Sequence, residues 1–210
     1  MKKGKFIVLE GLEGAGKTSA CKYIQNFLYN FGIKKTLLIR EPGSTFLSEK
    51  IRKFIKFNPK NEILNYKTIV LLLYASRLHL TDTIIKPTLK KGIWVISDRY
   101  ELSTFAYQGQ NSQKRINFIK KISSLILKKF YPNLTIYLDV LPHIGLKRIK
   151  KRGILDNIEK NNINFFLKVQ KTYLKYFKKK ENIFINANLS QNMVQKNLKH
   201  ILLKWLKKNI

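Results

Sequence analysis

Residues 6–18 read FIVLEGLEGAGKT, and this stretch decides the fold. Its second part, GLEGAGKT at 11–18, fits the phosphate-binding pattern G-x-x-x-x-G-K-[ST]. In such loops the glycines let the backbone curl so that its N–H groups point at a phosphate, and the lysine adds a positive charge. The pattern requires a strand before it and a helix after it. Both are expected here, because residues 6–9 are apolar and a helical sequence begins near Lys17.

The rest of the chain alternates short apolar runs with longer helical stretches, which is typical of a parallel sheet covered by helices. Strands are predicted at residues 6–10, 36–39, 93–97, 134–138 and 183–185. Helices are predicted to start near Lys17, Leu47, Tyr66, Lys114, Pro142 and Asn162, with a last one over about 191–208. The pattern predicts an α/β, three-layer P-loop NTPase fold with a five-stranded parallel sheet flanked by helices. We expect one domain over residues 1–210, with a short basic lid at about 147–160.

The composition fits a folded domain despite a strong positive charge. Of the 210 residues 44% are apolar, while 42 basic and 12 acidic residues give a formal net charge of +30. The longest apolar run, residues 69–75, is far shorter than the roughly 20 residues that span a bilayer, so we expect no membrane-spanning helix. The single cysteine, Cys21, cannot form an intramolecular disulfide. A cytoplasmic location is the expectation.

The positive charge has two readings. It is spread along the chain, and of the 42 basic residues 35 are lysines and only seven are arginines. This distribution favours a bias toward A- and T-rich codons, with a polyanion-binding protein as the alternative. We therefore expect no specific nucleic-acid partner and no membrane partner. Because arginine is scarce, each arginine indicates a place where a planar donor fork is needed.

The triplet Asp98-Arg99-Tyr100 directly follows the predicted strand at 93–97. In a parallel α/β sheet, ligands bind beyond the carboxyl ends of the strands. Asp98 and Arg99 are therefore expected at the edge that carries the phosphate-binding loop. A carboxylate there suits a metal shell, and an arginine fork can hold two oxygens of a second phosphate. A surface ion pair at a strand end is the alternative explanation of the triplet, and the accompanying phosphate-binding loop disfavours it.

Two further elements are ambiguous by themselves. Leu73 and Arg77 lie four residues apart and share one face of a predicted helix, which could receive a flat base. A core leucine beside a snorkelling arginine is the better explanation of that spacing alone. The basic run at 147–153 is either a solvated loop or a lid that neutralises charge on a transferred phosphoryl group.

Taken in order, the motifs resemble those of the bacterial thymidylate kinases, a branch of the P-loop nucleoside monophosphate kinases. The similarity runs through nearly the whole chain. The matching segments are VLEGLEGAGKT at 8–18, REPG at 40–43, YASR at 74–77, DRY at 98–100, ST at 103–104, AYQG at 106–109, YLDV at 137–140 and GLKR at 145–148.

The resemblance implies phosphoryl transfer from ATP to dTMP, giving dTDP and ADP, with Mg²⁺ and usually in a homodimer. The implied ATP-binding residues are Gly11, Leu12, Glu13, Gly14, Ala15, Gly16, Lys17 and Thr18. The implied substrate-binding residues are Glu13, Arg40, Leu73, Arg77, Arg99, Ser103, Thr104, Tyr107 and Gln108. Catalytic roles fall to Lys17, Asp98, Arg99, Arg148 and Arg152, and metal binding falls to Thr18 and Asp98. Because Gly14 stands where another branch of the family carries arginine, the lid arginines would supply the compensating charge.

In three places the chain departs from the family pattern. Leu73 stands where a phenylalanine usually stacks on thymine, so stacking is weaker or Tyr74 takes part. Ser44 replaces a common second glycine after Gly43, and Asn157 stands where related sequences often carry arginine. Two alternatives remain at this stage. One is a kinase of the same fold that acts on another nucleotide, and the other is a P-loop ATPase that binds nucleic acid.

Overall fold

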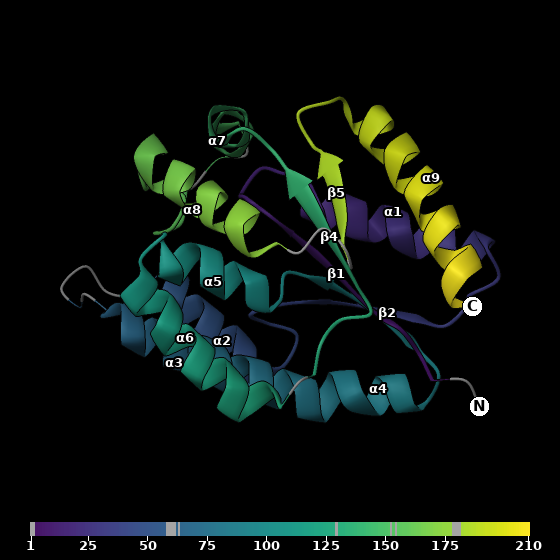
Figure 1. Cartoon of the computed structure of the whole chain (residues 1–210), viewed down its shortest axis with the longest axis horizontal. Coiled ribbons are helices and arrows are strands. Elements are labelled where there is room, and N and C mark those ends of the chain that lie inside the picture. The colour runs from purple at the N-terminus through teal and green to yellow at the C-terminus, as the bar shows by residue number, and fades with distance from the viewer. Residues whose placement is uncertain are drawn as a thin grey trace.

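The computed structural model describes residues 3–57, 62, 64–128, 130–151, 153, 155–177 and 182–210. Within this part of the chain, a sheet of five parallel strands lies between two layers of helices (Figure 1). The strands are β1 (Phe6–Gly11), β2 (Thr36–Arg40), β3 (Trp94–Asp98), β4 (Leu134–Asp139) and β5 (Ile183–Asn186). The helices are α1 (Lys17–Asn30), α2 (Phe46–Lys56), α3 (Tyr66–Leu80), α4 (Lys86–Lys90), α5 (Glu101–Gly109), α6 (Gln113–Leu127), α7 (Pro142–Lys150), α8 (Ile163–Tyr176) and α9 (Gln191–Asn209). A π-helical turn, Thr81–Ile85, joins α3 to α4.

The strand order β2-β3-β1-β4-β5 places β1 at the centre of the sheet. Residues on both faces of β1 are buried, which explains why it reads as a continuous apolar run. In the register of the sheet, Asp98 at the end of β3 is level with Leu9 on one side and Arg40 on the other. The carboxyl ends of β1, β2 and β3 therefore meet at one edge.

The core has two parts, one on each face of the sheet. Because side chains alternate along a strand, Ile7 and Leu9 pack in the cluster that includes α1 and α9, while Phe6 and Val8 pack with α3 and its continuation. Figure 1 shows α1 and α9 on one side of the sheet and α3, α4 and α6 on the other. This arrangement confirms the predicted three-layer α/β fold.

The predicted strands and helices are confirmed to within two residues at their starts, but one helical segment, α5, was missed. Helix α4 continues the helix that was predicted to start near Tyr66. Helix α5 has Tyr100 at its N-cap, and no side chain at that position caps it. Its first amide groups are instead bound by Glu10, which comes from β1 and is distant in sequence. A local pattern does not contain this contact.

The structure bears on two other expectations. Residues 147–150 of the predicted lid belong to α7, so the non-helical segment begins only after Lys150. One described helical stretch, Tyr66–Lys90, is long and apolar enough by length and composition to cross a membrane. The expectation of no membrane-spanning helix is not contradicted by this one stretch, because a helix in a protein core passes the same test. Much of this stretch is buried in the fold, including Val70, Tyr74 and the charged side chain of Arg77.

Candidate active site

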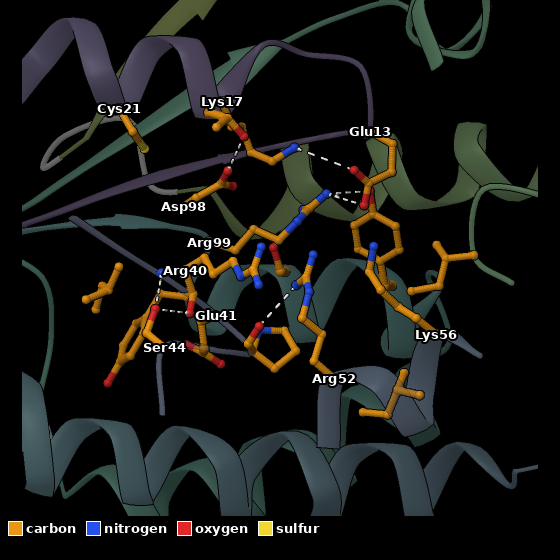
Figure 2. Close-up of a pocket in the computed structure, with 18 of the residues that line it drawn as sticks. Glu13, Lys17, Cys21, Arg40, Glu41, Ser44, Arg52, Lys56, Asp98 and Arg99 are labelled. Atoms are coloured by element: carbon orange, nitrogen blue, oxygen red, sulfur yellow. Dashed lines mark hydrogen bonds and ion pairs between the residues drawn. The ribbon is translucent and has the colours of Figure 1, made fainter. Parts of the chain in front are cut away.

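A cavity of about 1020 Å³ opens at the edge where β1, β2 and β3 end (Figure 2). Most residues singled out in the sequence line it: Glu13, Gly14, Gly16, Lys17, Thr18, Arg40, Leu73, Arg77, Asp98, Arg99, Ser103, Thr104, Tyr107, Gln108 and Arg148. Gly11, Leu12 and Ala15 are not among its lining residues, and the side chains of Leu12 and Ala15 belong to the core. Arg152 lies outside the described residues.

The phosphate-binding loop, residues 11–18, makes a sharp turn between β1 and α1. Gly14 and Gly16 have φ angles of 73° and 86°, which L side chains rarely adopt. A Cβ atom at Gly14 would also collide with the backbone carbonyl group of Gly145 in α7. The loop therefore packs directly against α7, and this packing requires glycine at position 14.

Lys17 is the first residue of α1, and its ammonium group folds back over the loop. Its Nζ donates hydrogen bonds to the carbonyl oxygens of Leu12 at 2.7 Å and Gly11 at 3.2 Å. It also lies 4.0 Å from a carboxylate oxygen of Glu13. Burial, and then the positive charge of Arg99, lower the pKa of Lys17 below its ordinary value. A buried cation at a helix N-terminus is well placed to meet a phosphate.

Thr18 and Asp98 bring two oxygen groups together at the cavity edge. The hydroxyl of Thr18 donates a hydrogen bond of 2.8 Å to Oδ2 of Asp98. Hydroxyl and carboxylate oxygens suit Mg²⁺, which usually takes one or two protein ligands and completes its shell with phosphate and water. The described residues contain no cluster of three or more histidine, cysteine, aspartate or glutamate side chains suited to a metal.

Arg99 is the centre of a hydrogen-bond network on the other side of the cavity. Its Nη2 donates to Glu13 at 2.6 Å. Its Nη1 donates to the carbonyl oxygen of Gly11 at 2.9 Å and to the hydroxyls of Ser103 and Tyr173, each at 3.0 Å. Arg99 has a φ of 75°, a strained value for a residue with a side chain. Several contacts therefore hold this residue in a conformation that it would not adopt alone.

Glu13 lies between the cations Lys17 and Arg99, as Figure 2 shows. Burial alone would raise the pKa of Glu13. The charges of Arg99, Lys17 and Lys56, together with the hydrogen bond from Arg99, lower that pKa to about 2. The Glu13 carboxylate is therefore ionised at neutral pH. In return its charge holds the pKa of Arg99 well above the ordinary value, although burial opposes this.

Arg77 reaches the far end of the cavity from α3. Its Nη2 forms an ion pair with Glu41 at 2.5 Å and donates to the hydroxyl of Thr104 at 2.8 Å. Both charged side chains are only 1% exposed, so the snorkelling arginine considered from the sequence is wrong. Among the described residues, Nε and Nη1 of Arg77 have no hydrogen-bond partner. Two nitrogens with three N–H groups are thus left without a partner in the described part of the chain, and both Arg77 and Leu73 line the cavity.

Tyr74 is not among the residues that line the cavity. Its hydroxyl donates to Glu101 at 2.8 Å, and its ring lies 4.6 Å from the guanidinium carbon of Arg77. Tyr74 therefore supports Arg77 from behind. Direct stacking of Tyr74 on a base, one of two explanations considered for Leu73, has no geometric support.

Ser44, which follows Gly43, adopts a left-handed φ of 68°. The turn at this position therefore keeps a conformation that usually needs glycine.

Arg40 is not free in the cavity, because its guanidinium group is paired with Glu49 at 2.9 Å.

The sequence analysis missed two other cations that line the cavity from α2, Arg52 and Lys56. Arg52 donates to the carbonyl oxygen of Pro42 at 3.0 Å. Glu49, Arg52 and Lys56 follow one another at intervals of three and four residues and share a helix face. That spacing is the signal that could have identified them.

The segment after α7 is held against the cavity by α2. Lys56 forms an ion pair with Asp156, and its carbonyl oxygen accepts a hydrogen bond of 3.1 Å from the Asn157 N–H. Arg148, in α7, donates to the carbonyl oxygens of Ala187 at 2.9 Å and Gly14 at 3.3 Å. Its guanidinium group therefore lies beside the phosphate-binding loop.

Comparison with known proteins gives a consistent result. The family model described as thymidylate kinase matches residues 9–198. The thymidylate kinase of Buchnera aphidicola subsp. Schizaphis graminum is 51% identical over 211 residues, covering 100% of both chains. The thymidylate kinase of Wigglesworthia glossinidia brevipalpis is 41% identical over 234 residues, again covering 100% of both chains. That of Legionella pneumophila (strain Paris) is 41% identical over 208 residues, covering 99% of this chain and 98% of the relative.

Proposed function

The chain belongs to the thymidylate kinase family, and from this premise we propose how its cavity carries out the reaction. The protein transfers a phosphoryl group from ATP to dTMP, giving dTDP and ADP. The observation that carries our assignment is that Lys17 and Arg99 face one cavity, with Glu13 between them. Lys17 binds the phosphates of the donor ATP, and Arg99 binds the phosphate of the acceptor dTMP.

The donor phosphates bind in the loop at residues 11–18. The loop amides and the N-terminus of α1 favour negative charge there. Lys17 leaves its carbonyl partners and turns to the β and γ phosphates, where its charge is needed. Leu12 and Ala15 contribute only backbone groups, because their side chains are in the core.

Mg²⁺ fits the hydroxyl of Thr18 and the carboxylate of Asp98, which lie 2.8 Å apart. When bound, the ion would neutralise charge on the phosphates of ATP. Asp98 would also hold water molecules around the reacting phosphates.

The acceptor nucleotide lies between Arg99 and Arg77. Arg99 holds the phosphate of dTMP, while Glu13 reaches the sugar 3′-hydroxyl. Arg40 helps through Nη1, because its hydrogen bonds to Glu49 use only Nε and Nη2. The unpaired N–H groups of Arg77, together with Thr104, read the thymine edge. Four further residues complete the site: Leu73 packs on the base, Tyr107 lies against C2′ of the sugar, and Ser103 and Gln108 complete the cavity wall.

The reaction needs positioning and charge neutralisation, and it requires no covalent intermediate or strong base. Arg148 and Arg152 are the proposed lid cations that approach the transferred phosphoryl group. Lys56 adds a third positive charge, because it lines the cavity and is held by the same segment.

We also propose that the protein is a cytoplasmic homodimer without specific nucleic-acid or membrane partners. The homodimer is supported by apolar side chains exposed on the adjoining helices α3 and α6, namely Leu71, Leu78 and Leu125. The even spread of lysines along the chain supports the absence of a specific nucleic-acid site.

A panel of nucleoside monophosphates tests this function. With ATP and Mg²⁺, ADP formation should be fastest with dTMP. The value of kcat/KM for dUMP should be at least about tenfold lower, because dUMP lacks one methyl group in an apolar pocket. The ribose analogue of dTMP should be a marginal substrate, and duplex DNA should not change the rate. Equal turnover of dCMP, AMP or GMP would overturn the assignment, and strong stimulation by DNA would favour the nucleic-acid ATPase.

Arg77→Lys tests the base site. Alanine is unsuitable here, because it would leave Glu41 buried without its partner at a cost of about 3–5 kcal/mol. Lysine keeps the charge but loses the planar fork. The value of kcat/KM for dTMP should fall about 10- to 100-fold, while KM for ATP stays the same. Arg115→Lys is the matched control, since Arg115 lies over the Tyr66 ring outside the main cavity. Unchanged dTMP kinetics in Arg77→Lys would place the base elsewhere.

A further inference from the structure

Glu10 is a buried carboxylate that the proposed reaction leaves without a role. It is the fifth residue of β1, its side chain is fully buried, and it is not among the residues that line the main cavity. Its Oε1 accepts the backbone N–H groups of Tyr100 at 2.9 Å and Ser103 at 3.3 Å. These two groups open helix α5, so Glu10 caps that helix from a different strand.

The second oxygen of Glu10 faces two hydroxyl groups. Oε2 accepts hydrogen bonds from Ser103 at 2.5 Å and from Tyr173 of α8 at 3.2 Å. The same two hydroxyls accept hydrogen bonds from Nη1 of Arg99, each at 3.0 Å. Glu10 therefore lies one hydroxyl group behind the guanidinium of Arg99.

The direction of these hydrogen bonds depends on the charge of Glu10. An ionised carboxylate only accepts, so it draws the hydroxyl protons of Ser103 and Tyr173 toward itself. The lone pairs of both hydroxyls are then turned to Arg99, which only donates. A neutral amide in place of the carboxylate would offer N–H donors to the hydroxyls and remove this alignment. The carboxylate also anchors the amide of Tyr100, next to the strained backbone of Arg99.

We propose that Glu10 is a positioning residue for the acceptor phosphate, acting on Arg99 through the hydroxyls of Ser103 and Tyr173. This inference rests on the proposed function, in which Arg99 holds that phosphate. Glu10 does not touch substrate. It orients the guanidinium group of Arg99 through the two hydroxyls, as hydrogen bonds from surrounding residues fix the side chains that contact a substrate.

The surroundings of Glu10 determine when it is charged. The ionisable groups that influence it, or that it influences, are Arg99, Glu41, Lys17, Tyr137 and Tyr173. Burial raises the pKa of Glu10 to about 7, against the hydrogen bonds of Ser103 and Tyr100 and the charge of Arg99. A proton taken up below that pH turns Glu10 into a neutral group, which resembles glutamine.

The test compares wild type with Glu10→Gln from pH 5.5 to 8.5, using kcat/KM for dTMP. We expect a ratio of wild type to variant near one at the acid end, where both side chains are neutral, and a rise to about tenfold above pH 8. Titration of the dTMP phosphate cancels in this ratio. KM for ATP should not change. A ratio that is flat with pH would overturn the proposal, because a purely structural role has no reason to follow this titration.

Two further variants keep the test decisive. Glu101→Gln is the matched control, because Glu101 accepts hydrogen bonds from Tyr74 and Ser123 and not from Arg99 or its hydroxyl partners; its ratio should be flat with pH. Tyr173→Phe removes one of the two hydroxyls and should raise KM for dTMP. If Glu10→Gln does not fold, the KM of Tyr173→Phe for dTMP tests the proposal instead, and an unchanged KM overturns it.

If the wild type prefers another monophosphate, the same ratio is measured with that acceptor. Failure of the substrate assignment can then be distinguished from failure of the proposed role of Glu10.

Discussion

Arg99→Met is expected to lower kcat/KM for dTMP by about 10³-fold. The guanidinium of Arg99 is the proposed partner of the acceptor phosphate and is held by Glu13, Ser103 and Tyr173. Two charge-assisted hydrogen bonds to a phosphate are each worth roughly 1.5–3 kcal/mol. Methionine fills a similar volume but supplies neither bond. Initial rates over a matrix of ATP and dTMP concentrations give the value.

The stability of this variant has to be measured beside its activity. Loss of Arg99 leaves the partly buried Glu13 carboxylate with Lys17 at 4.0 Å as its nearest ion-pair partner, which should lower the melting temperature. Arg99→Lys keeps a charge without the fork and should be intermediate in activity. Arg115→Met is the control for the substitution itself. A folded Arg99→Met that keeps kcat/KM within tenfold of wild type would remove Arg99 from the acceptor site.

Lys17→Met should lower kcat by about 10³-fold and leave KM for dTMP nearly unchanged. Preorganised positive charge at a transferring phosphoryl group contributes about 10²- to 10⁵-fold to rate in comparable sites. The ammonium group is buried at the start of α1, on the donor side of Glu13. Its removal takes away charge that acts mostly in the transition state. Single-turnover measurements of phosphoryl transfer separate this effect from product release.

Lys17→Met is also expected to fold well. The ammonium group is desolvated, its pKa is lowered by burial and by Arg99, and it donates hydrogen bonds to backbone carbonyl groups within the loop. Its ion-pair partner Glu13, at 4.0 Å, would keep the closer partner Arg99 at 2.6 Å. Burying a charge is itself costly, so its replacement by an apolar side chain of similar length removes that cost, and Glu13 is not left without a cation. The melting temperature should therefore not fall. Lys34→Met, at an exposed lysine over the Tyr29 ring, is the control. Normal kcat in Lys17→Met would show that the loop at 11–18 does not serve the donor phosphates.

The sequence predicted the elements whose determinants are local. The phosphate-binding loop, the strand before it and the helix after it lie within 25 residues, from Phe6 to Asn30. Asp98 and Arg99 could be assigned to the same edge because every strand of a parallel sheet ends there. The same rule predicted that the site residues at the ends of different strands lie together, and most of the predicted site residues line one cavity.

The tertiary structure decided what depends on contacts between distant parts of the chain. The Glu10 carboxylate is 90 residues from the amide of Tyr100 that it binds, and Lys56 is 100 residues from Asp156. Helix α5 was missed because its cap comes from β1. The burial of Arg77 could not be predicted because Glu41, its partner, lies at the end of another strand. A sequence pattern records which residues alternate or repeat along one element, whereas the partner of a buried charge is determined by the order of the strands and the packing of the layers.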